Sequence, residues 1–292
     1  MLCVVLFWGG NYTFSKFGME VLSPEMFTLI RFAIVFPILL IGLWWKEKSI
    51  AIEKRDIPRL IIVSLVGISI YQTLFMVSIH NTSATNSSLM IALSPIFTGI
   101  LSIAGGKEKF TWRVQAGSLL AFLGAAAVIG MGNEGFAFRS NHLYGDLIGL
   151  IAALFWGWYP ILAEPLVKKY SSLRVTAWSS GIAAALLVPI NMTQLLTTSW
   201  HWSAGVWGSL LYAAIPVTVY GLVVWYYGVS KIGPTKVMVY MYMVPLVAIL
   251  IAAVVLHESL NLLQGLGGIV ILLGITVVKW EGKTKVSHSI AK

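Results

Sequence analysis

A helical face near the N-terminus carries side chains that can bind a ligand. Residues at the spacing i, i+3, i+4 and i+7 share one face of an α-helix, and here they are Trp8, Asn11, Tyr12 and Ser15. That face combines an indole, an amide and two hydroxyls within an otherwise apolar stretch. Aromatic faces attract flat ligands and organic cations, and the polar groups can orient them by hydrogen bonding. The pattern therefore predicts a binding surface.

Comparable side chains occur in other apolar stretches. Trp156 and Tyr159 form a matching face, and the remaining candidates are Tyr71, Phe75, Asn86, Met90, Tyr220, Tyr240 and Met243. We expect these side chains to converge on a cavity that has aromatic walls and a few hydrogen-bonding groups. Trp8 and Trp156 could instead be packing anchors.

The composition places these faces in a membrane. The chain is 58% hydrophobic and 11% charged, whereas a soluble domain has about 25% charged residues. The apolar runs are continuous instead of alternating, which favours helices over a β-barrel. The single cysteine excludes an intramolecular disulfide and a cysteine-based metal site. The sequence predicts an all-α integral membrane protein without a cofactor.

A membrane helix needs about 20 mostly apolar residues. Ten runs meet this requirement, and they are 2–19, 25–45, 58–80, 83–104, 112–132, 145–167, 172–194, 204–229, 233–256 and 262–280. With both termini in the cytoplasm, 17 of the 20 Lys and Arg residues lie on the cytoplasmic side, as the positive-inside rule requires. This distribution explains the net charge of +9 without a nucleic-acid partner.

The two halves of the chain, 1–140 and 141–292, resemble each other. FWGG at 7–10 is echoed by FWGW at 155–158, and a shift of 150 aligns Pro95 with Pro245 and Glu108 with Glu258. Each half contains five predicted helices, so the second half enters the membrane with opposite polarity. Inverted repeats are typical of secondary transporters that alternate access to a midplane site. Gene duplication in a structural or enzymatic membrane protein is the alternative.

The repeat also predicts hinge and gate residues. Pro95 and Pro245 each lie inside a predicted span, where proline removes a backbone hydrogen bond, so both are predicted hinges. Glu108 and Glu258 are predicted helix-end or gate residues. Glycines in the fifth and tenth spans predict close packing between those two helices.

Charged groups inside a membrane are candidates for function. Lys16 and Arg31 could attract a ligand carboxylate, or they could pair with Glu20 or Glu25 or extend to the interface. His80 and Glu164 are possible proton sites, although a solvated loop histidine and a Glu164–Lys168 pair are the simpler interpretations. Because no Asp or Glu lies near the middle of a predicted span, we expect facilitated or weakly coupled transport.

These motifs together resemble the drug/metabolite transporter superfamily, in its ten-helix EamA type, over essentially the whole chain. The resemblance is carried by FWGG and FWGW, by the TSAxxxSLxxxLxP-like segment at 82–95 with its weaker copy at 233–245, and by the Glu and Gly-rich segments at 108–124 and 258–274. It implies export of amino acids, metabolites or drugs across the bacterial inner membrane. Within the superfamily, the sequence is most similar to the aromatic amino acid exporters, which also handle compounds like methyl viologen.

The expected partners are a small-molecule substrate and the lipid bilayer, and we expect the monomer to be functional. Other amino acids, nucleobases or cationic drugs are alternative cargo. A channel or a membrane enzyme is the alternative class. The sequence offers no metal-ligand cluster, no GxxxxGK[ST] motif and no nucleophile with a placed base for an enzyme.

Overall fold

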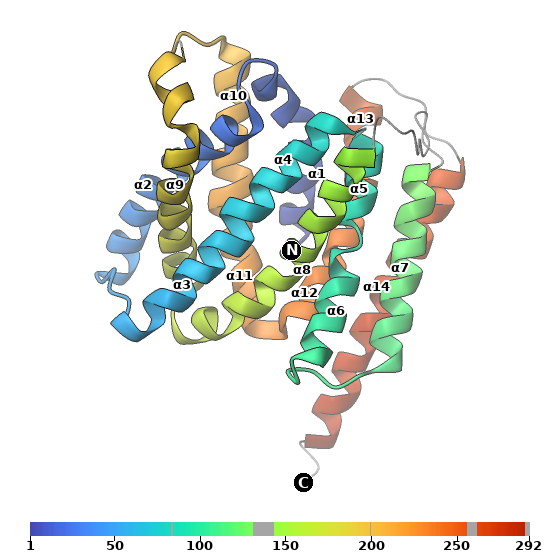
Figure 1. The fold of residues 1–292 in the computed structure, drawn as a ribbon. Coiled ribbons are helices and arrows are strands. Elements are labelled where there is room, and N and C mark those ends of the chain that lie inside the picture. Colours follow the sequence, from blue (N-terminus) through green and yellow to red (C-terminus); the bar gives the residue numbers. More distant parts are fainter. Residues whose placement is uncertain (83, 131–142, 199, 256–261, 290–292) are drawn as a thin grey trace.

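The chain folds as a bundle of helices in the computed structural model (Figure 1). The structure describes residues 1–82, 84–130, 143–198, 200–255 and 262–289, and these residues contain no strand. The predicted all-α class is therefore confirmed.

Each predicted apolar run coincides with one helix or with a series of helices. The first half contains α1 (Leu2–Met19), α2 (Pro24–Glu47), α3 (Ile57–Ser64), α4 (Tyr71–Asn81), α5 (Ala84–Ile91), α6 (Ser94–Ala104) and α7 (Trp112–Gly130). The second half contains α8 (Leu143–Lys169), α9 (Ser172–Thr197), α10 (Ala204–Tyr212), α11 (Gly221–Ile232), α12 (Pro234–Met238), α13 (Met243–Val255) and α14 (Leu262–Ser289). Shorter segments are the 3₁₀ turns η1 (Lys54–Asp56) and η4 (Val239–Tyr242) and the π-helical segments η2 (Leu65–Ile70) and η3 (Ala213–Tyr220).

Several of these helices are long and apolar enough to cross a membrane. In the described residues there are seven, namely Pro24–Glu47, Lys54–Asn81, Ser87–Ala104, Trp112–Gly130, Leu143–Lys169, Ser172–Thr197 and Ala204–Ile232. The predicted runs without such a helix are 2–19, 233–256 and 262–280, and the last of them contains the shorter apolar helix Gly265–Val278. Ten spans with cytoplasmic termini therefore stay a prediction.

Helices from corresponding places in the two halves pair at the edges of the bundle. α2 packs along α9, and α7 packs along α14 (Figure 1). The α7–α14 contact brings backbones together, because a Cβ added at Gly274 would lie 2.6 Å from the carbonyl oxygen of Gly117. A Cβ at Gly267 would lie 2.9 Å from the carbonyl oxygen of Gly124. The predicted glycine-lined packing of these two helices is confirmed.

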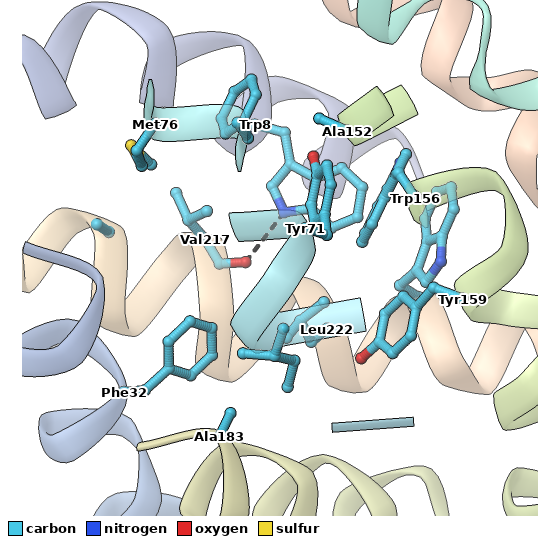
Figure 2. Close-up of a cluster of buried hydrophobic side chains, with 14 of the residues drawn as sticks. Trp8, Phe32, Tyr71, Met76, Ala152, Trp156, Tyr159, Ala183, Val217 and Leu222 are labelled. Atoms are coloured by element: carbon cyan, nitrogen blue, oxygen red, sulfur yellow. Dashed lines mark hydrogen bonds between the residues drawn. The ribbon is translucent and has the colours of Figure 1, made fainter. Parts of the chain in front are cut away.

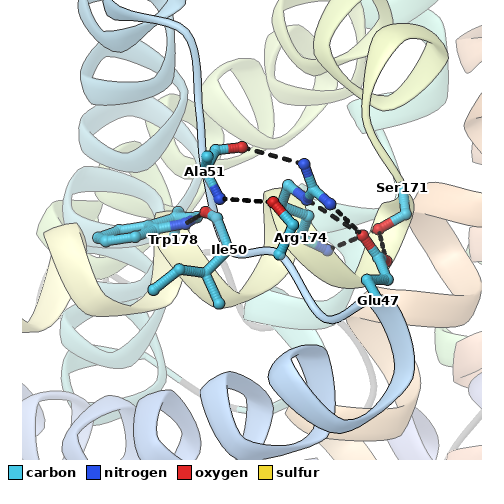
Figure 3. Close-up of polar contacts among 7 residues, drawn as sticks. Glu47, Ile50, Ala51, Ser171, Arg174 and Trp178 are labelled. Atoms are coloured by element: carbon cyan, nitrogen blue, oxygen red, sulfur yellow. Dashed lines mark hydrogen bonds and ion pairs between the residues drawn. The ribbon is translucent and has the colours of Figure 1, made fainter.

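Polar contacts fix the other edge pair at one end. Ser171 caps α9, and its hydroxyl accepts the N–H of Arg174 at 3.0 Å. Arg174 Nη2 lies 2.7 Å from Glu47 Oε2 at the end of α2, and Arg174 Nη1 donates to the carbonyl of Ala51 at 3.0 Å (Figure 3). Trp178 Nε1 donates to the carbonyl of Ile50 at 2.8 Å. The segment that follows α2 is thus held against the start of α9.

The first helix of each half packs mainly on the other half. α1 contacts α13, α10, η3 and α11, whereas α8 contacts α4, α6, α5 and η2. Each of these two helices therefore lies against the third and fourth apolar runs of the opposite half. Side chains of the two helices meet in the interior of the bundle, where the rings of Trp8 and Trp156 are in contact.

The remaining irregularities also occur in matching places. The π-helical segments η2 and η3 interrupt the third and eighth runs. A break after Ile91 precedes Pro95 in the first turn of α6, and the 3₁₀ turn η4 precedes Pro245 in the first turn of α13. The helices are interrupted next to both predicted hinge prolines, and their role as hinges stays a prediction.

The glycine seam makes a stability prediction. Gly274→Ala places a Cβ 2.5 Å from the backbone nitrogen of Ala121, and forced overpacking costs about 1–3 kcal/mol. We expect a lower melting temperature for the purified protein in detergent. Gly265→Ala on the same helix is the control, because no atom lies within 4 Å of the added Cβ there. Equal melting temperatures for the two variants would show that the backbones are not in close contact.

Candidate functional site

Aromatic rings from four helices meet at the centre of the bundle. Trp8 of α1 and Trp156 of α8 have ring centroids 5.5 Å apart at 65°. Tyr71 of α4 stacks on Trp156 at 4.5 Å, and Trp225 of α11 lies 4.9 Å from Trp8 (Figure 2 shows Trp8, Tyr71 and Trp156). The two repeat-related tryptophans are therefore in direct contact. Such ring pairs add about 0.5–1.5 kcal/mol each beyond the burial of their area.

The indole of Trp8 is fixed by the backbone of a π-helical segment. Its Nε1 donates to the carbonyl of Val217 at 2.9 Å (Figure 2), in the middle of η3. The ring can approach because position 221 is glycine, where a Cβ would lie 2.6 Å from Trp8 Nε1. π-Helical turns are frequent at functional sites, because their wider hydrogen-bonding pattern alters which groups face a cavity.

The second half makes a comparable contact with the first. Tyr159 of α8 packs on η2, where a Cβ added at Gly67 would lie 1.6 Å from the Tyr159 ring. Tyr159 is fully buried, and its ring lies 5.5 Å from Trp156 and 5.4 Å from Tyr226. It forms a second layer behind the rings that meet Trp8.

A small cavity lies beside this cluster. It offers about 40 Å³ to the centres of water molecules, and it is lined by Trp8, Asn11, Tyr12, Arg31, Tyr71, Gln72, Phe75, Trp156, Val217, Leu222, Met241 and Val244. This volume suffices for water but not for an amino acid, so a larger ligand requires the rings to separate. The described lining residues include one cation and no carboxylate.

Six of the predicted binding residues line this cavity together: Trp8, Asn11, Tyr12, Tyr71, Phe75 and Trp156. Tyr12 packs edge-on against Phe75 at 5.4 Å, and Phe75 stacks with Tyr71 at 5.8 Å. Asn11 is 6% exposed, and its Oδ1 accepts the hydroxyl of Ser15 at 3.0 Å. The helical spacing thus selected neighbouring side chains, whose role in binding stays a prediction.

Four other candidates lie elsewhere. Tyr220 is 42% exposed and packs on Phe7; the shift of 150 aligns it with Ile70, whereas the counterpart of the cavity residue Tyr71 is Gly221. Met90 packs near Gly149 of α8, and Met243 lies half-buried beside the core. Tyr240 lines a second, larger cavity. None of these four lines the cavity beside Trp8.

The predicted charged sites have different surroundings. Arg31 is 2% exposed in the central cavity wall, so it does not extend to the interface. His80 is exposed, and Glu164 pairs with Lys168 at 2.8 Å. Glu108 lies near Gly233 in the turn between α11 and α12. Glu258 lies outside the described residues, as do the side chains of Lys16 and Asn86.

Three buried groups were missed. Trp225 and Tyr226 complete the ring cluster, and Trp225 is the residue that the shift of 150 aligns with Phe75, so the repeat could have identified it. Asp146 near the start of α8 is 7% exposed and accepts the hydroxyl of Thr82 at 2.7 Å. No sequence signal distinguishes it from an exposed helix-start carboxylate.

A larger, basic cavity lies at the end of the bundle that is expected to face the cytoplasm. It offers about 630 Å³ to the centres of water molecules, and it is lined by Lys168, Ser230, Lys231, Ile232, Gly233, Lys236, Val239, Tyr240, Ile275 and Val278. The turn η4 lies between the two cavities, since Tyr240 lines the basic cavity and Met241 lines the central one.

Nearby, burial lowers the pKa of Lys107, and the Glu164 carboxylate opposes this shift. The Lys107 ammonium donates to the carbonyl of Ile161 at 2.7 Å.

Comparison with known proteins identifies the class. The EamA-like transporter family matches residues 1–130 and 143–280, and the chain belongs to this family. It is an integral protein of the inner membrane and a transporter, not an enzyme. The structure also resembles a solved crystal structure of another protein, with a TM-score of 0.81. The two sequences are 16% identical, and the match covers 97% of this chain and 96% of the other.

Several relatives are similar over most of their length. An uncharacterized transporter of Archaeoglobus fulgidus is 27% identical over 93% of each chain. The uncharacterized transporter YyaM of Bacillus subtilis is 27% identical over 92% of this chain and 89% of its own. A probable terminal-alkyne amino-acid exporter of Streptantibioticus cattleyicolor is 28% identical over 77% of this chain and 73% of its own.

The contact between Gly67 and Tyr159 can be tested by a double-mutant cycle. Gly67→Ala should lower the melting temperature, because the new Cβ collides with the Tyr159 ring. Tyr159→Leu should remove that collision, so the double variant should be more stable than the sum of the single losses by about 0.5–3 kcal/mol. Gly42→Ala, which meets no atom within 4 Å, is the control. Strictly additive losses would contradict the packing of Tyr159 on η2.

Proposed function

We propose that this transporter exports amino acids or related small metabolites, with aromatic amino acids and similar planar compounds as its main cargo. The observation that carries this proposal is the central cavity, where Trp8 and Trp156 meet beside Tyr71 and Phe75. Flat rings can bind a flat ligand with little loss of side-chain entropy. The amides of Asn11 and Gln72 also line this cavity and can bind polar groups of the same ligand. The similarity to the Streptantibioticus relative, a probable terminal-alkyne amino-acid exporter, supports this choice of cargo.

We further propose ten membrane spans arranged as two inverted five-helix repeats, with both termini in the cytoplasm. The matching positions of η2 and η3 support this arrangement. So do the edge pairs α2–α9 and α7–α14, in which each helix packs on its counterpart from the other half. A two-fold axis in the membrane plane brings such counterparts together.

Alternating access is the proposed mechanism. The basic cavity is the entry from the cytoplasm, and η4 with the ring cluster forms the barrier to the central site. Separation of the rings admits the substrate, and rocking of the two halves then opens the outer side. The helix breaks beside Pro95 and Pro245 supply flexible positions for this motion.

Counterflow of L-phenylalanine in proteoliposomes tests the proposed cargo and site. Trp156→Ala should lower the initial rate at least about tenfold, because several ring contacts worth about 0.5–1.5 kcal/mol each are lost. Trp158→Ala is the matched control, since Trp158 lies on the same helix and is 41% exposed. Wild-type rates for Trp156→Ala in a folded protein would place the binding site elsewhere.

The absence of a carboxylate among the described residues of the central cavity predicts transport without obligatory proton coupling. Efflux of L-phenylalanine down its own gradient should continue when a protonophore collapses the pH gradient. Strict dependence on an imposed pH gradient would contradict this expectation, and Asp146→Asn would then test the buried carboxylate on α8.

A further inference from the structure

Arg31 is a cation in the interior of the bundle. It lies on α2 and is 2% exposed, and it contributes to the wall of the central cavity. Its Nε donates to the hydroxyl of Thr218 at 2.6 Å. That hydroxyl itself donates to the carbonyl of Ala213 at 2.7 Å, so its only proton is already in use. Thr218 therefore acts as a fixed acceptor that orients the guanidinium.

No carboxylate balances this charge in the described part of the chain. The ion pairs found there involve Arg55, Lys168, Lys169 and Arg174, and none involves Arg31. Glu20 is exposed, and the buried Asp146 accepts a hydrogen bond from Thr82. A buried charge without a counter-charge is costly, and arginine cannot lose its proton to escape that cost.

The free edge of the guanidinium suits one kind of ligand. Among the described residues, no acceptor is hydrogen-bonded to Nη1 or Nη2 of Arg31, whereas Nε is engaged by Thr218. A planar fork of N–H donors binds a carboxylate through two parallel hydrogen bonds. The rings of Trp8, Tyr71 and Trp156 line the same cavity, so an apolar or aromatic body can lie beside a carboxylate held at Arg31.

We infer that Arg31 binds the carboxylate of the transported molecule, and that the substrates are therefore organic acids or zwitterions with an apolar body. This inference rests on the proposed transport through the central cavity. It favours amino acids over planar cations, because a cation in this cavity faces the Arg31 charge without a described carboxylate to offset it.

The first test measures stability without ligand. If Arg31 binds a ligand, its unpaired charge lowers the stability of the ligand-free protein. Arg31→Gln should then have a melting temperature in detergent equal to or above that of wild type. If Arg31 instead holds the fold together, Arg31→Gln should melt well below wild type or fail to fold. Either of the latter results would overturn the inference.

The second test uses two probes of nearly the same shape. 3-Phenylpropionate carries a carboxylate, and 3-phenylpropanamide replaces it with a neutral amide. The acid should raise the wild-type melting temperature more than the amide does. Arg31→Gln should weaken the apparent affinity for the acid at least tenfold and abolish the difference, and Arg31→Lys should restore part of it. Equal effects of both probes on wild type, no effect of the acid, or an unchanged response in Arg31→Gln would each overturn the inference.

Counterflow of L-phenylalanine separates this inference from the proposed function. Transport by wild type that Arg31→Gln leaves unchanged would refute the role of Arg31 while the proposed function stands. Absence of L-phenylalanine transport, together with Arg31-dependent stabilisation by 3-phenylpropionate, would refute the proposed cargo while the carboxylate site stands.

Discussion

The arrangement of the bundle depends on the contact by which α1 reaches across to the second half. Trp8 carries this contact, because its indole N–H binds the carbonyl of Val217 and its ring meets Trp156 and Trp225. An indole N–H in an apolar interior needs an acceptor, since the cost of leaving a buried donor unpaired is about 1–3 kcal/mol. The Val217 carbonyl accepts that N–H, so the large ring of Trp8 is held at the centre. The small central cavity lies beside this ring.

The helices at the edge of the bundle pack differently from those at its centre. At α7 and α14, glycines at 117, 124, 267 and 274 allow backbone to touch backbone, and close approach of this kind maximises van der Waals contact between membrane helices. At the centre, bulky rings keep the helices apart. A tightly packed seam therefore borders a central region that contains a cavity. This contrast suits a protein that must enclose a small ligand and release it.

The sequence was most informative where the polar and aromatic helical faces coincided with the internal repeat. The spacing in the first helix selected Trp8, Asn11 and Tyr12, and the echo of FWGG selected Trp156; all four line one cavity. Tyr220 lies outside this cavity, because the repeat aligns it with Ile70, the neighbour of Tyr71, and not with Tyr71 itself. Trp225 was overlooked although it aligns with Phe75. The burial of Arg31 also could not be read from the chain, since its flexible stem permits either an interior or an interfacial position.

The buried charge constrains the transport cycle itself. In the proposed mechanism the central site faces the cytoplasm and the outside in turn, and Arg31 must pass through an enclosed state between them. With a carboxylate bound, the guanidinium is paired during that passage. Without it, the charge relies on Thr218, on the Phe32 ring whose centroid lies 5.5 Å from the guanidinium carbon, and on the few waters that about 40 Å³ can hold. Together these are a poorer substitute for bulk solvent. Reorientation of the empty protein is then slower than reorientation of the loaded one, so exchange of one substrate for another should outpace net export. A single uncompensated arginine can in this way set both what is carried and which step limits the rate.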